Sequence, residues 1–305
     1  MINNLITTIL FTTIIRPTTI LLVKVLSILP LKFRIYIGRF GAYILTPFLR
    51  RENFFIKLQS KVFFKKEISP YKIYANIAQT FFEAFNLSDI KDENISVYQS
   101  EDNILEKVAK NDKATIVLTA HTGNWELLAA YFIKKGFKIA TAAKKLEFVV
   151  GQEIIEKIRR SYGIKTIWRG GRSGAKEILN EIEKKHVMAV LIDQHTKVSS
   201  LDSVFFNHEV KVPSSLIKMA VKHNTNTIVA FNFRRDITHY DFYIHLLKPN
   251  LTQEEIAREY NELLEKYIRM YPEQWVWFHK RWRVLNGKDL SRKKYIEHLN
   301  DLLAK

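Results

Sequence analysis

Two residues in the segment LTAHTGNWELLAA, numbered 118–130, have the types and spacing of a reacting pair. His121 ends an apolar run, and Glu126 falls five residues later, on the first turn of the expected helix. Gly123 permits a tight turn between them, and Asn124 is a plausible helix N-cap. Across that turn the carboxylate can reach one imidazole nitrogen, fix the tautomer and leave the other nitrogen to take a proton. The pair is therefore suited to deprotonating an alcohol.

A simpler interpretation is that Glu126 complements the helix dipole and His121 is an ordinary turn residue. Other catalytic classes have less support. The chain has no cysteine and no Gly-x-Ser-x-Gly turn, so nothing suggests a covalent acyl-enzyme. It also has no His-Glu-x-x-His zinc helix, and a metal site made of His121, Asp193 and His195 would be generic. We expect neither a metal nor a cofactor.

Strands and helices that position these residues alternate along the chain from residue 114. The expected strands are 114–120, 137–143, 164–168, 187–193, 227–233 and 241–247. The expected helices are 53–88, 124–136, 149–162, 174–185, 213–223 and 252–270. This order predicts an α/β fold with a mostly parallel central sheet flanked by helices, to which the segment 227–247 adds antiparallel strands as a hairpin.

Ligands of such sheets lie beyond the carboxyl ends of the strands. We therefore expect three polar groups at one edge. His121 follows the first strand, Asp193 and Gln194 end the fourth, and the turn WRGGR after the third strand carries Arg169 and Arg172. Backbone N–H groups and arginines ahead of a helix suit a phosphate, although this turn lacks the Gly-Lys-Ser/Thr of a P-loop.

The net charge of +17 is concentrated near the two ends of the chain. Residues 1–51 contain no acid and seven bases, namely Arg16, Lys24, Lys32, Arg34, Arg39, Arg50 and Arg51. A second basic cluster spans 280–294. This charge favours anionic partners, and we expect no nucleic acid because zinc-finger, RNP-like and basic heptad patterns are absent.

The apolar stretch 1–31 is about long enough to reach across a bilayer, but Arg16, Pro17 and Pro30 interrupt it. It predicts a membrane-anchoring helical segment, either one kinked span or an interfacial helix with its basic residues at the lipid headgroups. A buried helix pair is the alternative. The remaining residues, 32–305, are expected to form a single domain.

Several ordered motifs resemble the late acyltransferases of lipid A biosynthesis, the lauroyl and myristoyl transferases within the lysophospholipid acyltransferase superfamily. HTGNWELLA is similar to their His-x-Gly-Asn-Trp-Glu signature. The likeness continues through AKKLEF, KIRRSYGIKTI, AVLIDQ, VFFNHEVKVPSSLIKMA and YPEQWVWFHKRWR, and it covers about residues 20–285. Thr122 stands where an aromatic residue is usual, and DQHTK departs from the family pattern.

The resemblance implies transfer of a fatty acyl group from an acyl-carrier-protein thioester to a hydroxyl of a lipid A precursor, at the cytoplasmic face of the bacterial inner membrane. His121 would be the general base, and Glu126 would orient and polarise it. Arg159 would bind a substrate phosphate or the oxyanion, with Arg160 as the rival. Asp193, Gln194, Asn124, Arg169 and Arg172 complete the expected substrate-binding residues.

Two other functions remain open. The acceptor of the same chemistry is alternatively a lysophospholipid or another hydroxylated membrane lipid. A function of another class is that of a non-catalytic, basic membrane adaptor, although a scaffold does not require an ordered series of motifs. In YPEQWVWFHKRWR, the tryptophans Trp275, Trp277 and Trp282 are interpreted as partly packed in the core and partly membrane-facing.

Overall fold

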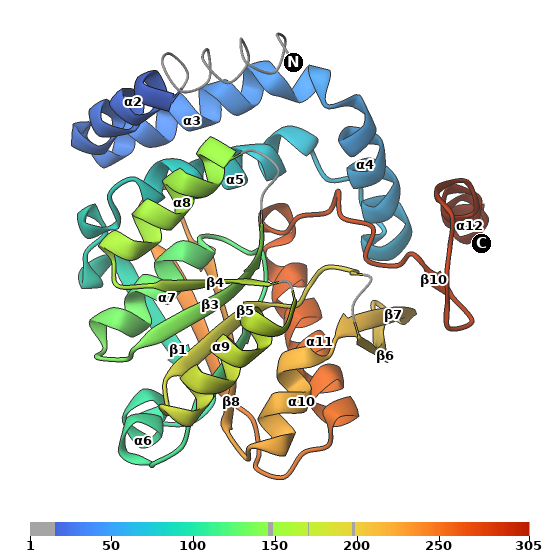
Figure 1. Ribbon diagram of the computed structural model, residues 1–305. Coiled ribbons are helices and arrows are strands. Elements are labelled where there is room, and N and C mark those ends of the chain that lie inside the picture. Colours follow the sequence, from blue (N-terminus) through green and yellow to red (C-terminus); the bar gives the residue numbers. More distant parts are fainter. Residues whose placement is uncertain (1–15, 146–148, 170, 197–198, 305) are drawn as a thin grey trace, which may run out of the picture.

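A sheet of seven strands organises the protein, as the computed structural model shows (Figure 1). The structure describes residues 16–145, 149–169, 171–196 and 199–304. Within them the strand order is β1-β9-β8-β2-β5-β3-β4. The bounds are β1 Ile95–Gln99, β2 Thr115–Thr119, β3 Ile139–Lys144, β4 Lys165–Arg169, β5 Val187–Leu191, β8 Asn226–Arg234 and β9 Tyr240–Leu246.

The predicted mostly parallel sheet is confirmed. Strands β8, β2, β5, β3 and β4 run parallel, and β9 is antiparallel to β8, as expected of the hairpin. Strand β1 pairs in parallel with β9 and was not expected. The sequence pattern also missed the separate hairpin of β6 (Ser200–Phe205) and β7 (His208–Pro213) and the short pair β10 (Val284–Leu285) and β11 (Lys288–Asp289).

Helices cover both faces of the sheet. Those within the predicted α/β region are α7 Trp125–Lys134, α8 Val149–Ser161, α9 Gly171–Glu183, α10 Ser215–Lys222 and α11 Gln253–Met270. Helix α6 (Ile104–Lys110) precedes β2, and α12 (Arg292–Ala304) ends the described chain. Single 3-10 turns lie at η2 Thr46–Phe48, η3 Leu87–Asp89, η4 Asp92–Asn94 and η5 Pro272–Gln274.

The single helix predicted over 53–88 is wrong. The chain forms α4 (Arg50–Phe64) and α5 (Pro70–Ala84) instead. Lys65 ends α4 in the left-handed conformation, with φ 58°, and Pro70, five residues later, starts a new helix rather than continuing the old one. The split lets α5 turn back under the N-terminal helices and bring its buried face to the sheet.

The N-terminal part of the described chain forms two helices, α2 (Arg16–Ile28) and α3 (Leu31–Leu45), separated at Pro30. Helix α3 packs along α5 at the top of Figure 1. Arg34 is fully buried and donates to the carbonyls of Ser27 and Asn86 and to the carboxylate of Asp89, so α2 and α3 are tied to the domain.

The outer side of α2, α3 and η2, which we term the α2–α3 apolar face, exposes large apolar side chains. They are Leu21, Leu22, Val25, Ile28, Phe33, Tyr36, Phe40, Tyr43, Ile44, Leu45 and Phe48. None of the helices in the described chain is both long and apolar enough to span a bilayer. Residues 1–15, which make up half of the predicted anchor, lie outside the described residues.

Side chains of alternating strand residues divide the core between the two faces of the sheet. On one face Val117, Ile139 and Ala189 pack under α7. On the other, Ile116, Ala140 and Val190 belong to a larger cluster that includes α10, α11 and the three tryptophans of the C-terminal segment. The two strands that carry the catalytic candidates, β2 and β5, are neighbours at the centre of this core.

Candidate active site

The turn between β2 and α7 is held in one conformation by buried polar residues. Gly123 has φ +51°, and a Cβ there would collide with the Asn232 carbonyl, so this turn requires glycine. Asn124 is the N-cap predicted for α7 and accepts from the Leu127 N–H. Its amide donates to the buried Glu83 carboxylate at 2.7 Å, and its backbone pairs with Asn232.

This full set of partners changes the role expected of Asn124. The side chain is completely buried, and the cap and Glu83 use its oxygen and its nitrogen. The structure thus gives Asn124 a structural role, and substrate binding by Asn124 stays a prediction. Asn124 fixes the turn that carries His121 and Glu126.

His121 and Asp193 form a hydrogen-bonded pair of titratable groups at the carboxyl edge of β2 and β5. The Nδ1 atom of His121 lies 2.8 Å from Oδ1 of Asp193. The backbone N–H of His121 donates to Oδ2 of the same carboxylate at 3.1 Å. Adjacent strands bring them together, although they are 72 residues apart in the sequence.

The protonation of this pair follows from the burial of Asp193. Burial would raise the pKa of this fully enclosed carboxyl, but the charge of His121 and its hydrogen bonds lower the pKa to about 2. An ionised carboxylate only accepts hydrogen bonds, so Nδ1 must carry the proton. In the neutral ring Nε2 is then the basic nitrogen, on a side chain that is 27% exposed.

The predicted contact of Glu126 with His121 is replaced by two other pairs. Glu126 accepts two hydrogen bonds from Arg159, from Nε at 2.9 Å and from Nη2 at 2.6 Å. Both side chains are nearly buried, with exposures of 12% and 11%. Asp193 is thus the residue that orients His121, a position that sequence reasoning had given to Glu126. The sequence carried a signal for this role of Asp193, because Asp193 closely follows β5, the strand that neighbours β2.

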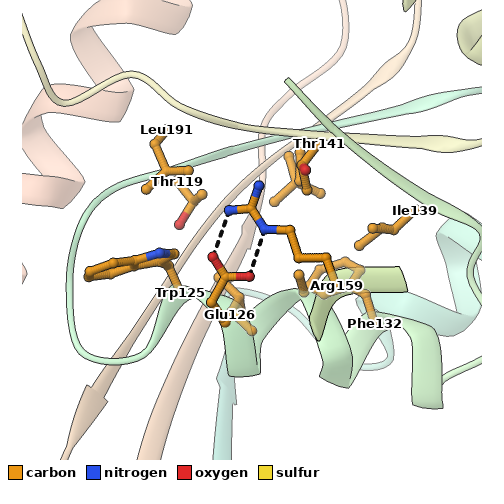
Figure 2. A pocket seen from close by; sticks show the side chains of 12 residues that line it. Thr119, Trp125, Glu126, Phe132, Ile139, Thr141, Arg159 and Leu191 are labelled. Atoms are coloured by element: carbon orange, nitrogen blue, oxygen red, sulfur yellow. Dashed lines mark hydrogen bonds and ion pairs between the residues drawn. The ribbon is translucent and has the colours of Figure 1, made fainter. Parts of the chain in front are cut away.

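Figure 2 shows the small cavity that the Glu126–Arg159 pair closes. Its walls are mainly apolar and come from β2, β3, β5 and α7, including Thr119, Phe132 and Leu191. The cavity has a volume of about 20 Å³, little more than one water requires. We call it the Glu126–Arg159 cavity. It adjoins His121 through Trp125, whose ring lies edge-on to the imidazole with 5.2 Å between centroids.

The two candidate arginines of α8 are clearly different. Arg159 faces the site, whereas Arg160 points to solvent with its side chain 80% exposed and pairs with Glu156 one turn earlier. Burial lowers the pKa of Arg159, but Glu126 raises it by more, so the net pKa is raised and the guanidinium stays charged. Arg159 is therefore the arginine that belongs to the site.

Gln194 lies beside the imidazole, with its amide nitrogen 3.3 Å from Nδ1 of His121. Arg169 ends β4, the edge strand, and three strand spacings of about 4.8 Å separate it from β2, roughly 14 Å in all. Arg172 is exposed on the first turn of α9. Arg169 thus lies at the same carboxyl edge of the sheet as His121 and Gln194, but three strands away from His121.

Sequence reasoning missed the residues that hold Asp193. The Trp275 indole donates to Oδ2 of Asp193 at 3.0 Å, and Arg281 donates to the carbonyl of Ile192, the preceding residue. Trp275, Trp277 and Trp282 are all buried, with exposures of 1% or less, so their expected membrane-facing role is wrong. They pack edge-to-face and stacked against one another, which a wet interface would not provide.

The family model of the bacterial lipid A biosynthesis acyltransferases matches residues 10–284. The chain belongs to this family. No curated protein matches it. Among solved structures it is similar to the 1-acyl-sn-glycerophosphate acyltransferase PlsC from Thermotoga maritima, with 14% identity, 80% of this chain and 99% of that chain covered, and a TM-score of 0.37.

Membership in the lipid A acyltransferases agrees with the chemistry that the site can perform. The family's His-x-x-x-x-Glu motif is present, but each member of the motif has a partner from elsewhere in the fold. No group of residues suited to holding a metal ion occurs in the described part of the chain. What the site offers is an imidazole held by a buried carboxylate.

Proposed function

We propose that this acyltransferase moves a fatty acyl group from the thioester of an acyl carrier protein to a hydroxyl of a lipid A precursor. The observation that carries the proposal is the His121–Asp193 pair, because it leaves Nε2 of His121 as an available base. The alcohol is a weak nucleophile, and a base within hydrogen-bond reach raises its reactivity as the new bond forms.

The reaction needs one proton transfer in each direction. Nε2 of His121 takes the hydroxyl proton as the oxygen attacks the thioester carbonyl carbon. The tetrahedral intermediate collapses with cleavage of the C–S bond, and the imidazolium returns the proton to the departing thiolate. Asp193 stays ionised and stabilises the imidazolium that forms between the two steps. No covalent acyl-enzyme is needed, because the thioester is already activated.

Arg159 has a part in this scheme that differs from phosphate binding. Glu126 engages its Nε and Nη2, and the carboxylate balances the positive charge of the guanidinium. A guanidinium whose charge is already balanced is better suited to donating one hydrogen bond to a carbonyl or oxyanion than to balancing a phosphate. We therefore assign Arg159 to the thioester oxygen and Glu126 to positioning Arg159.

The protein is proposed to act at the cytoplasmic face of the inner membrane. The α2–α3 apolar face combines exposed Phe and Tyr side chains with basic neighbours such as Lys24 and Lys32, which suits an anionic lipid surface. Flotation of the full chain with vesicles of phosphatidylethanolamine and phosphatidylglycerol tests this. Phe40→Glu should weaken vesicle binding, whereas Tyr98→Glu, an equally drastic change on β1, should not. Equal loss in both variants would argue against this surface.

The activity is tested with purified protein, a fatty acyl-carrier-protein thioester and a panel of acceptors. The panel contains a phosphorylated lipid A precursor, its dephosphorylated form and a lysophospholipid. Transfer should be fastest to the phosphorylated precursor, and the KM for the carrier thioester should rise with ionic strength as charge pairing is screened. Preference for the lysophospholipid would establish the alternative acceptor. No transfer to any lipid would favour the non-catalytic adaptor.

A further inference from the structure

A second cavity opens on the face of the sheet opposite the Glu126–Arg159 cavity. We call it the α9–α10 pocket, and its volume is about 220 Å³. Its walls come from the carboxyl-terminal halves of β3, β4 and β5, from the end of β7 and from the first two turns of α9 and α10. The lining includes Arg169, Ala175, Ile178, Val190, Ile192 and Met219.

Strand β5 and Ile192, the residue that follows it, contribute side chains to the walls of both cavities. Ala189 and Leu191 point to the Glu126–Arg159 cavity, and Val190 and Ile192 point to the α9–α10 pocket. Ile192 immediately precedes Asp193, which holds His121. The α9–α10 pocket therefore reaches the carboxyl edge of the sheet at the residue before Asp193, and α/β proteins bind their ligands at this edge.

The two cavities differ in size and in charge. The α9–α10 pocket has about 220 Å³, whereas the Glu126–Arg159 cavity has about 20 Å³. In the smaller cavity the positive charge of Arg159 is balanced by the carboxylate of Glu126. Arg169, in contrast, has no carboxylate partner among the described residues, and desolvation lowers its pKa. An apolar pocket with an uncompensated arginine at one end matches an alkyl chain joined to an anionic group.

We propose that the α9–α10 pocket binds an alkyl chain of the anionic acceptor lipid, with a phosphate of that lipid on Arg169 and its hydroxyl presented to His121. The inference rests on the proposed acyl transfer and adds where the acceptor lies. It gives Arg169 a function at its observed position, three strands from the base. Only the acceptor is expected to use this face of the sheet.

Filling the pocket tests its use by the acceptor. Ala175 is an exposed position on α9 that lines the pocket, so Ala175→Trp narrows it without burying a new side chain in the core. We expect the KM for the phosphorylated precursor to rise by about tenfold, which corresponds to ~1.4 kcal/mol, while the KM for the carrier thioester is unchanged. Lys176→Trp, at the neighbouring position outside the pocket, should leave both constants unchanged.

Removing the charge tests the phosphate contact separately. Arg169→Gln should raise the KM for the phosphorylated precursor by roughly tenfold, the loss of a charge-assisted hydrogen bond, and should leave the dephosphorylated precursor unaffected. Lys176→Gln removes a charge from the same region and should change neither. Dodecyl phosphate should inhibit competitively against the acceptor, dodecanol more weakly, and inorganic phosphate not at all.

The outcomes separate this proposal from the activity itself. If the wild-type protein transfers acyl groups but Ala175→Trp raises the KM for the thioester instead, the pocket binds the donor chain and the inference is wrong. Unchanged constants in Ala175→Trp and Arg169→Gln would also overturn it. A wild-type protein without any transfer would refute the proposed function, and dodecyl phosphate protection of the fold against heat, lost in Arg169→Gln, would still support the pocket.

Discussion

His121–Asp193 and Glu126–Arg159 lie on either side of one turn, yet only the first pair can move a proton. The imidazole of His121 is partly exposed and keeps a basic nitrogen, because Asp193 accepts from the other one. In the second pair Arg159 is held charged by a carboxylate that receives two of its N–H groups. The His-x-x-x-x-Glu motif therefore supplies one residue to each of two pairs with different chemistry, His121 to the first and Glu126 to the second.

The largest effect is expected for His121→Ala, which removes the base. Acyl transfer should fall by about 10²–10⁴-fold, the usual contribution of general base catalysis. The free energy of unfolding should fall as well, because the buried Asp193 loses its imidazole partner and keeps only the hydrogen bonds from the Trp275 indole and from the backbone N–H of residue 121. Single-turnover rates together with urea unfolding check both statements. A variant with near wild-type transfer would end the assignment.

Asp193→Asn should give the next largest loss. The amide can donate to Nδ1, which shifts the ring proton to Nε2 and removes the basic lone pair from the substrate side. We expect kcat to fall by about 10²–10³-fold, less than the loss known for the equivalent change in a protease triad. The pH–rate profile distinguishes orientation from structural support, since the wrong tautomer cannot be corrected by raising the pH. Recovery at high pH would contradict this role.

Glu126→Gln should mainly affect stability. It leaves Arg159 charged and nearly buried without its partner, which costs roughly 3 kcal/mol of unfolding free energy. The double variant Glu126→Gln/Arg159→Gln should regain most of that stability, while transfer stays reduced because the oxyanion contact is lost. Urea unfolding of the three proteins measures the coupling. A Glu126→Gln variant that is as inactive as His121→Ala and yet fully stable would contradict this positioning role.

Trp275→Phe should have a smaller effect on the His121–Asp193 pair. It removes the indole N–H that Asp193 accepts at 3.0 Å and keeps an aromatic ring in the core. Loss of one hydrogen bond to a charged group predicts about a tenfold drop in kcat. Trp277→Phe is the matched control, because its indole donates to the Pro272 carbonyl instead. Equal losses in both variants would assign the effect to packing.

A still smaller effect concerns His279, which lies near the first pair. Burial is the main reason that its pKa is lowered to about 4 from an ordinary 6.5. The unfolded chain therefore binds more protons between these values, so the fold is expected to lose stability as the pH falls from 6.5 to 4. Melting temperatures across this range should decline less in His279→Gln. Parallel declines in both proteins would exclude His279 as the source.

Asp193 makes a second contribution to the pH dependence of stability, which has the same sign and occurs at lower pH. Its folded pKa of about 2 lies below the ordinary 3.8, so its stabilisation is complete above 3.8 and is lost as the pH falls towards 2. The pH range of the His279 contribution, from 6.5 to 4, lies above that of the Asp193 contribution, from 3.8 to 2, so one measurement of stability against pH distinguishes them.

The sequence alone was enough to predict the alternation of strands and helices, the tight turn at Gly123, the N-cap at Asn124 and the family. These are local properties, because period-2 and period-3.6 patterns and positive φ angles act within a few residues. The break between α4 and α5 was also local, and it was missed although Pro70 marks it. The unexpected β1 pairs with a strand about 145 residues away, which no local pattern encodes.

The partners of the functional residues, in contrast, depend on the tertiary structure. Glu126 is near His121 in sequence, but a carboxylate pairs with whichever cation is closest in space, and α8 brings Arg159 to it. Asp193 reaches His121 because β5 neighbours β2, and Trp275 reaches Asp193 because the C-terminal segment packs beneath that edge. Hydrogen bonds depend on distances of about 3 Å between atoms, and strand order and helix packing fix such distances between residues far apart in the chain.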